Sequence, residues 1–260
     1  MGTAAVQGDL WNGNPRDWAE FQEPLFAPLY RAVLDNAAVA AGARVLDVGC
    51  GSGFFCSLAA KRGATVAGID AATGLLAIAR ERTPEGDFRA GDMEDLPFTD
   101  RTFDLVAGFN SFQFAADPVN ALRQARRVAK PEGKVAMAVW GSAKACQAAD
   151  LVKALGSILP PPPPGTPGPF ALSEPGVVET MLSKAGLTPE RSADIDTPFD
   201  FANDETAYRA FAASGPGIRA IRHAGDDKLR ATMLQAFAPF KTKSGSFHLD
   251  NKFRLVVARP

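Results

Sequence analysis

The sequence contains few of the residues that build metal centres and disulfide frameworks. Among its 260 residues there are three cysteines and two histidines. Cys50, Cys56 and Cys146 are too few and too scattered along the chain for a disulfide framework or a typical zinc site. We therefore expect reduced thiols, no bound metal ion and a cytoplasmic location.

The chain also lacks a strong charge of either sign and a long apolar run. A formal net charge of −1 gives no overall basic field, which disfavours nucleic acid or an anionic membrane as a partner. The stretch from Met1 to Asn36 has no long apolar run, so we expect neither a signal peptide nor a membrane span. With 46% hydrophobic and 22% charged residues, the composition is that of a globular protein with a sizeable core.

What the sequence does contain is a glycine-rich segment between an apolar strand and a helix. Residues 44–48 are mostly apolar, Gly49, Gly51 and Gly53 follow at alternate positions, and a helical pattern begins at Phe54. Glycine lets the backbone turn sharply and approach a ligand. Free N–H groups at the start of the following helix favour an anionic group. We therefore predict a ligand-binding loop between a buried parallel strand and a helix.

Three interpretations of this loop stay open on its residues alone. A dinucleotide loop has the form Gly-x-Gly-x-x-Gly, and a phosphate loop ends in Gly-Lys followed by Ser or Thr. The third interpretation is a glycine-rich turn without a ligand. Asp47 lies at the carboxyl end of the strand, where it would repel a pyrophosphate but attract an ammonium or sulfonium group. This carboxylate favours a cationic ligand.

Residues 45–53 resemble motif I of the class I S-adenosylmethionine-dependent methyltransferases, which has the form Asp-x-Gly-x-Gly-x-Gly. The resemblance covers roughly residues 40–141 and is strongest to the ubiquinone- and menaquinone-biosynthesis-like branch. It implies S-adenosylmethionine as cofactor and a small-molecule methyl acceptor. The resemblance and the strand ends together give the candidate cofactor-binding residues Asp47, Gly49, Cys50, Gly51, Gly53, Asp70, Ala71, Gly91, Asp92, Met93, Asn110 and Gln113.

Three of these candidates have a stated role in holding an adenosine group. Asp70 ends a second apolar strand, where a carboxylate can accept hydrogen bonds from both ribose hydroxyls. It also argues against a ligand with a ribose 2′-phosphate. The resemblance implies that Asp92 accepts from the exocyclic amine of adenine and that Met93 covers the ring.

A fourth strand, residues 103–109, should end at the same crevice as the first two. Asn110 and Gln113 follow it and are candidates for polar contacts to cofactor or substrate. The stretch lacks the Asn/Asp-Pro-Pro-Tyr/Phe motif that many methyltransferases of nucleic-acid bases or of glutamine carry. This departure makes a DNA, RNA or glutamine substrate less favoured.

Strands and helices alternate through residue 141, which predicts an α/β fold with a doubly wound, Rossmann-like and mostly parallel sheet. Residues 189–201 and 253–258 each contain a further strand pattern. Family topology would pair these two strands as an antiparallel addition at the sheet edge.

The same pattern suggests how the chain is divided. We expect a helical N-terminal flap over residues 1–40 and a helical cap over residues 199–247, on the substrate side. Residues 41–198 and 248–260 then form the S-adenosylmethionine-binding domain.

Several local signals mark helix ends and a connection. Asp117 followed by Pro118 predicts a helix start, and Ser173 predicts the N-cap of a helix that runs to Lys184. The five prolines at 160–164 predict a stiff extended connection.

Methyl transfer from a sulfonium is an in-line displacement that depends mainly on positioning. A general base is needed only when the nucleophile arrives protonated, and His223 and Tyr30 are the candidates for that role. We expect a small, partly apolar or aromatic acceptor and a monomer or homodimer. The alternatives are a nicotinamide-dependent oxidoreductase, or a methyltransferase-like protein that binds without transferring methyl.

Overall fold

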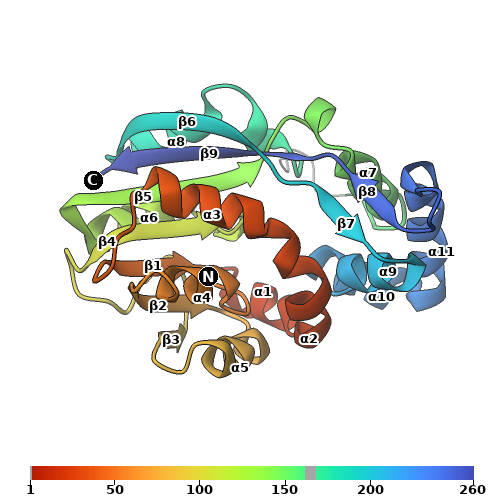
Figure 1. The fold of residues 1–260 in the computed structure, drawn as a ribbon, viewed down its shortest axis with the longest axis horizontal. Helices are drawn as coiled ribbons and strands as arrows, with labels where there is room; N and C mark the ends of the chain where they lie inside the picture. Colours follow the sequence, from red (N-terminus) through yellow and green to blue (C-terminus); the bar gives the residue numbers. More distant parts are fainter. Residues whose placement is uncertain (1, 162–167) are drawn as a thin grey trace.

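A computed structural model of the chain describes residues 2–161 and 168–260. Its centre is a seven-stranded sheet (Figure 1). The strands are β1 (Arg44–Val48), β2 (Thr65–Asp70), β3 (Asp87–Ala90), β4 (Phe103–Phe109), β5 (Ala129–Trp140), β6 (Thr188–Asp196) and β9 (Lys252–Arg259). Their order is β3-β2-β1-β4-β5-β9-β6, with β1 to β5 parallel and β9 antiparallel to both β5 and β6. The predicted α/β doubly wound sheet with an antiparallel edge is therefore confirmed.

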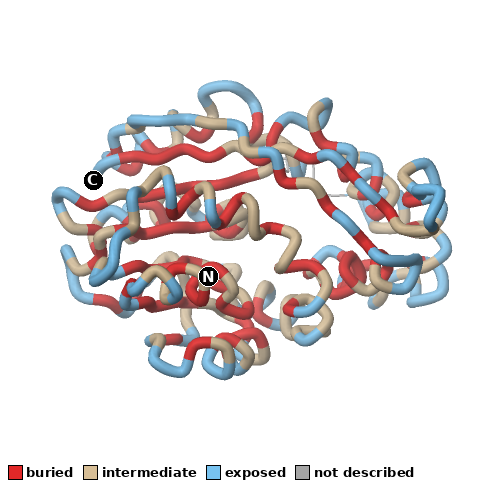
Figure 2. The backbone as a smooth tube through the Cα atoms, viewed as in Figure 1, coloured by how far each residue is buried: buried red, intermediate tan, exposed pale blue. Residues whose placement is uncertain are grey.

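Two hydrophobic cores lie on the two faces of this sheet. In β1, Val45 belongs to one core, whereas Leu46 and Val48 belong mainly to the other, because successive side chains of a strand point to opposite faces. The first core is covered by α3 (Ala27–Asn36), α4 (Phe54–Ala60) and α5 (Thr73–Arg82), and the second by α6 (Pro118–Val128) and α8 (Val177–Lys184). Figure 2 shows buried positions along the central strands and more exposed ones along the edge strand β6.

One predicted helix start is confirmed and another is wrong. The side chain of Asp117 accepts from the main-chain amide of Asn120 at 3.0 Å, and caps α6. Ser173 does not cap α8, since its hydroxyl donates to the main-chain oxygen of Phe170 at 2.7 Å. Helix α8 starts instead after Gly176, whose left-handed φ of 81° places the turn there. Most of the proline connection predicted at 160–164 lies outside the described residues.

Three α-helices lie between β6 and β9 in the chain. Strands β7 (Phe199–Phe201) and β8 (Phe247–Leu249) pair antiparallel in a separate two-stranded sheet. Between them lie α9 (Asp204–Ala212), α10 (Gly215–Ala224) and α11 (Asp226–Phe237). The helical character expected for 199–247 is present here, and its role as a substrate cap stays a prediction.

The N-terminal segment, residues 2–36, is also helical. It comprises α1 (Ala4–Trp11), α2 (Pro15–Asp17), a π-helical turn (Trp18–Gln22), a 3-10 turn (Glu23–Phe26) and α3. Figure 1 places α1 and α2 beside α9 and α10. Two ion pairs join these parts, Arg209 with Asp17 at 2.6 Å and Arg222 with Asp9. Within the described residues, no helix combines the length and apolarity that crossing a bilayer requires.

Candidate cofactor-binding site

The loop after β1 turns through three glycines with left-handed backbone conformations. The φ angles are 76° at Gly49, 52° at Gly51 and 75° at Gly53. A Cβ at Gly49 would lie 2.5 Å from the Cβ of Ser111, and one at Gly53 would lie 2.8 Å from the Cβ of Ala79. Conformation and close packing therefore both require glycine in this loop.

The main-chain amides of residues 49–53 all donate within the chain. Those of Gly49 and Cys50 donate to the main-chain oxygen of Ile69 at 2.8 and 3.0 Å, and that of Gly53 donates to the oxygen of Cys50 at 2.9 Å. The remaining two donate to side-chain carboxylates, Gly51 to Asp70 and Ser52 to Glu23. The amides of residues 49–53 are therefore engaged within the chain, and the expected anion-binding role of the N–H groups at the start of the following helix stays a prediction.

Asp70 ends β2 directly beside the loop. Its Oδ2 accepts from the amide of Gly51 and its Oδ1 from the amide of Ala72, both at 2.8 Å. Burial raises the pKa of Asp70, while these main-chain donors oppose that rise. Each carboxylate oxygen can accept a second hydrogen bond, so the oriented, half-buried Asp70 can still receive hydroxyl donors.

Asp47 lies at the end of the neighbouring strand, β1, and is 2% exposed. Its Oδ1 is buried and has no hydrogen-bond partner among the described residues. Desolvation raises the pKa of Asp47 well above its usual value, and the carboxylates of Glu23 and Asp70 add to that rise. A buried acceptor without a partner is costly, and a ligand ammonium group would have the charge and donors to satisfy it.

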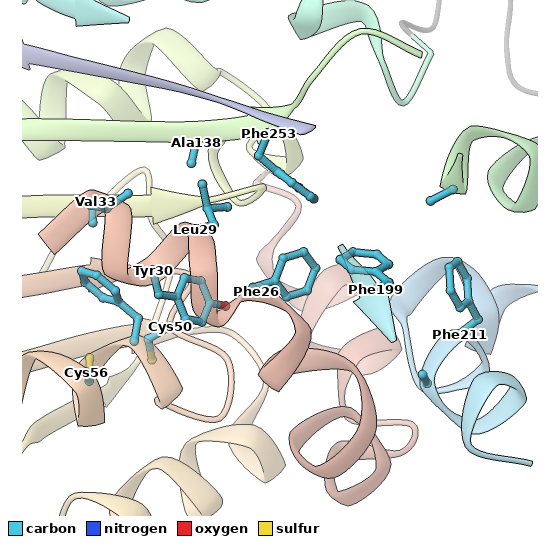
Figure 3. Packing of buried hydrophobic residues seen from close by; sticks show 14 of the residues in the cluster. Phe26, Leu29, Tyr30, Val33, Cys50, Cys56, Ala138, Phe199, Phe211 and Phe253 are labelled. Carbon is cyan, nitrogen blue, oxygen red and sulfur yellow. The ribbon is translucent and has the colours of Figure 1, made fainter. Parts of the chain in front are cut away.

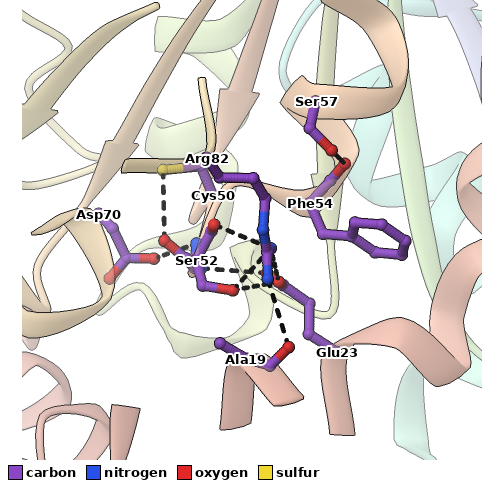
Figure 4. A network of polar contacts seen from close by, with 9 residues as sticks. Ala19, Glu23, Cys50, Ser52, Phe54, Ser57, Asp70 and Arg82 are labelled. Carbon is purple, nitrogen blue, oxygen red and sulfur yellow. Dashed lines mark hydrogen bonds and ion pairs between the residues drawn. The ribbon is translucent and has the colours of Figure 1, made fainter. Parts of the chain in front are cut away.

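The N-terminal segment contributes a buried carboxylate to the same loop (Figure 4). Glu23, 2% exposed, accepts from the Ser52 amide through Oε1 at 3.0 Å, and its Oε2 is hydrogen-bonded to the Ser52 hydroxyl. Arg82, in the last turn of α5, places Nη1 2.6 Å from Oε2 and also donates to the Ser52 main-chain oxygen at 2.9 Å. Burial raises the pKa of Glu23, and the Arg82 guanidinium acts against it. The sequence prediction missed this cluster; an acidic residue within an aromatic stretch was its only local signal.

Helix α1 covers the residues expected to hold the adenosine. A Cβ on Gly8 would lie 2.6 Å from the main-chain oxygen of Ala71, and one on Gly2 would lie 2.3 Å from Oδ2 of Asp92. The other carboxylate oxygen of Asp92 accepts from the amide of Glu94 at 2.9 Å. The amino-terminal helix therefore lies directly on this end of the site.

The remaining cofactor candidates lie near the same edge of the sheet. The amide of Gly91 donates to the main-chain oxygen of Asp70 at 3.1 Å, and Met93 is half-buried against the second core. Asn110 adopts a φ of 50° and its Oδ1 accepts from the amide of Trp140 at 3.2 Å. This bond between the ends of β4 and β5 gives the Asn110 oxygen a structural role.

Gln113 is the last of the predicted cofactor contacts. It is half-buried in the short 3-10 turn Phe112–Phe114, which follows β4. Its part in binding stays a prediction.

The two predicted general bases occupy different environments. Tyr30 is 7% exposed, and its ring centroid lies 4.5 Å from that of Phe109 at the end of β4. Burial raises the pKa of Tyr30 well above its usual value, and Glu23 and Asp47 add to the rise, so its hydroxyl stays protonated at neutral pH. His223 is exposed at the end of α10. Tyr30 thus lies near the loop with a raised pKa that opposes loss of its proton, and His223 faces solvent; a role as base stays a prediction for both.

A cavity of about 400 Å³ lies elsewhere, between α2 and the helices α9 to α11. Its charged lining residues pair among themselves. Arg209 binds Asp17, and Arg230 lies 2.8 Å from Glu205. None of the residues that line this cavity belongs to the glycine loop.

A family model described as a methyltransferase domain matches residues 46–137. A demethylmenaquinone methyltransferase from Renibacterium salmoninarum is 38% identical over 108 residues, which are 42% of this chain and 46% of that protein. A ubiquinone biosynthesis O-methyltransferase from Paracidovorax citrulli is 36% identical over 114 residues, 42% of this chain and 48% of that protein. The chain therefore spans about half the length of these relatives.

Among solved structures, a methyltransferase from Aquifex aeolicus that depends on S-adenosylmethionine has the same fold. It gives a TM-score of 0.53 at 21% identity, over 70% of this chain and 92% of that one. Residues 46–137 thus match a methyltransferase domain, and the fold around them is shared with a methyltransferase that depends on S-adenosylmethionine. The two curated relatives, each matched over less than half of its length, are named for methylation in quinone biosynthesis. The nicotinamide-dependent alternative is not favoured.

Proposed function

We propose that the protein transfers a methyl group from S-adenosylmethionine to a small-molecule acceptor. The observation that carries this proposal is the pair of carboxylates at the ends of adjacent strands, Asp47 on β1 and Asp70 on β2. Asp47 has a buried oxygen without a partner, which suits an ammonium group. Asp70 is held by two amides with acceptor capacity left, which suits a ribose diol.

In this proposal the residues bind and orient, and they exclude water. The bound cofactor supplies a methyl group activated by the positive sulfonium. Asp47 is buried next to the loop and its Oδ1 has no partner among the described residues, so this side favours a cationic ligand. Positioning of the reacting groups supplies about 7–11 kcal/mol of barrier reduction in favourable cases. The raised pKa of Tyr30 keeps its hydroxyl protonated, so the proposal does not depend on Tyr30 as a base.

The proposed acceptor is partly apolar or aromatic. Aromatic side chains gather beyond the carboxyl ends of β4 and β5, with Phe26 stacked 6.1 Å from Tyr30 and crossing Phe199 edge-on at 5.5 Å (Figure 3). Trp140 and Phe253 continue this group, with ring centroids 4.5 Å apart. Such rings favour flat apolar molecules. The demethylmenaquinone relative, named for a quinone precursor, is in keeping with an acceptor of this kind.

We propose further that the protein acts in the cytoplasm on a small molecule, without nucleic acid or membrane as partner, as a monomer or homodimer. The free cysteines and the near-zero net charge support this setting. The cysteines and the net charge do not identify the methyl acceptor.

A screen of small phenols, quinones, amines and carboxylates tests the proposed activity. The assay follows S-adenosylhomocysteine release from S-adenosylmethionine. We expect at least one acceptor class to raise the release above the acceptor-free rate, and the Asp70→Ala variant to lose most of that increase. Asp87→Ala, a change at an exposed carboxylate on β3 paired with Arg89, is the matched control. Tight cofactor binding without turnover for every acceptor class would instead support a binding protein.

A further inference from the structure

We infer that the indole N–H of Trp18 is the hydrogen-bond donor for the carboxylate of the cofactor's amino-acid moiety. This inference rests on the proposed function and adds to it a residue from the N-terminal segment, outside the matched family region 46–137.

The first observation is an unsatisfied donor. Trp18 opens the π-helical turn of the N-terminal segment, and its ring nitrogen Nε1 is buried. No described residue accepts a hydrogen bond from it. An indole nitrogen can only donate, and native proteins rarely leave a buried donor unpaired. Trp18 Nε1 is therefore placed to serve an acceptor that comes from outside the chain.

The second observation is where this donor lies. Trp18 Nε1 is 3.4 Å from the position that a Cβ would take on Gly51, the middle glycine of the loop. Glu23 Oε1 lies 2.9 Å from the same position. A side chain at residue 51 would thus press on the Glu23 carboxylate and the indole nitrogen, and glycine lets the loop backbone lie close to both.

The ring is held in this orientation by its neighbours. Trp11 packs edge-on against Trp18 with ring centroids 4.7 Å apart and planes at 79°. Phe26 lies on another side at 6.2 Å. A donor fixed in this way loses little side-chain freedom when it binds a ligand.

Three donors close to Trp18 in the loop and in α5 are already engaged. The amides of Gly51 and Ser52 donate to Asp70 and Glu23, and Arg82 forms an ion pair with Glu23. A ligand carboxylate that enters among three acidic side chains needs a donor to offset repulsion. Trp18 Nε1 supplies one, while the unpartnered Asp47 Oδ1 suits the ammonium group on the same ligand carbon. The two charged ends of an amino acid are thereby recognised separately.

The test compares two ligands that differ in the amino-acid moiety. S-adenosylhomocysteine has the carboxylate, whereas 5′-methylthioadenosine keeps the adenosine and thioether without it. Trp18→Phe removes the N–H and retains an aromatic ring. By calorimetry on the full chain, we expect the variant to bind S-adenosylhomocysteine about tenfold more weakly and methylthioadenosine within about twofold of the unmodified protein.

Arg16→Ala is the control, because Arg16 is an exposed residue of the same N-terminal segment, 77% exposed and 3.9 Å from Glu81. We expect it to leave both affinities unchanged. If Trp18→Phe does not fold, benzothienylalanine at position 18, in which sulfur replaces the N–H, provides the same comparison with nearly the same ring.

The outcomes separate this inference from the proposed function. Equal losses for both ligands, or no loss for either, would overturn the role of Trp18 while leaving the cofactor site in place. Binding of neither ligand to the unmodified protein would overturn the proposed function, and the inference with it.

Discussion

The carboxylate oxygen Oε1 of Glu23 accepts a hydrogen bond from the main-chain amide of Ser52 at 3.0 Å. This contact brings a residue of the N-terminal segment into the loop that follows β1. Arg82 completes the arrangement from α5, 2.6 Å from Glu23 Oε2. Order in the N-terminal segment is thereby coupled to order in the loop.

Removal of Arg82 should destabilise the protein strongly. Arg82→Ala leaves the Glu23 carboxylate buried without its cation, since that side chain is only 3% exposed. Loss of one partner of such a pair costs about 3–5 kcal/mol, which urea unfolding measures. Arg16→Ala is the control, because Arg16 is 77% exposed and 3.9 Å from Glu81; its effect should stay within about 0.5 kcal/mol. A loss at Arg82 no larger than that of the control would contradict the pairing.

Substitution of Asp47 should affect stability and binding in opposite directions. Its pKa is raised in the folded protein, so its contribution to stability is fully present below the unfolded pKa of about 3.9 and is lost as pH rises through the folded value. Asp47→Asn removes the free-energy cost of ionising this buried carboxyl at higher pH. We expect a higher unfolding midpoint at pH 7, a difference that disappears toward pH 4, and a smaller midpoint increase on addition of S-adenosylhomocysteine. A variant less stable at pH 7 would show that Asp47 is satisfied in the free protein.

Asp70→Ala should weaken the binding of adenosyl ligands by roughly 1.5–3 kcal/mol, about tenfold or more. The reason is the loss of charge-assisted hydrogen bonds to the ribose. Calorimetry with 5′-methylthioadenosine isolates this part of the ligand from the amino-acid moiety. The exposed control Asp87→Ala should bind normally, and an equal affinity for Asp70→Ala would remove that residue from the site.

His248 should make the stability of the two-stranded β7–β8 sheet depend on pH. Its Nδ1 lies 2.7 Å from Asp200 on the paired strand, and this hydrogen bond is the main cause of its raised pKa, with Asp250 adding to it. The contribution is complete below the unfolded pKa of about 6.5 and is lost as pH rises through the higher folded value. An NMR titration of the His248 ring should show a lower pKa in Asp200→Asn. An identical titration curve would show that the pair does not form in solution.

The parts of this fold that local sequence patterns govern could be predicted. The apolar runs of β1, β2 and β4 are short and continuous, the glycine turn requires positive φ, and Asp47 and Asp70 occupy strand ends fixed by those runs. Parallel strands then bring the two carboxylates to one edge. Strands β1 and β2 are neighbours and pair in parallel, as this expectation requires.

Contacts between distant segments could not be predicted in the same way. Nothing local to Glu23 indicates that it pairs with Ser52 and Arg82, because that pairing depends on how the N-terminal segment folds over the loop. The hydrogen bonds from the loop amides to Asp70 and Glu23 also join segments that are distant in the sequence, so they could not be predicted either. At α8 the sequence predicted a start at Ser173, whereas the left-handed turn at Gly176 sets the observed start.

The central claim is that this crevice recognises an adenosyl amino acid through Asp47 and Asp70. The most direct measurement is a calorimetric titration of the unmodified protein with S-adenosylhomocysteine and, separately, with NADH. We predict saturable binding of S-adenosylhomocysteine and no binding of NADH. Tight binding of NADH, with no heat from S-adenosylhomocysteine, would contradict the account.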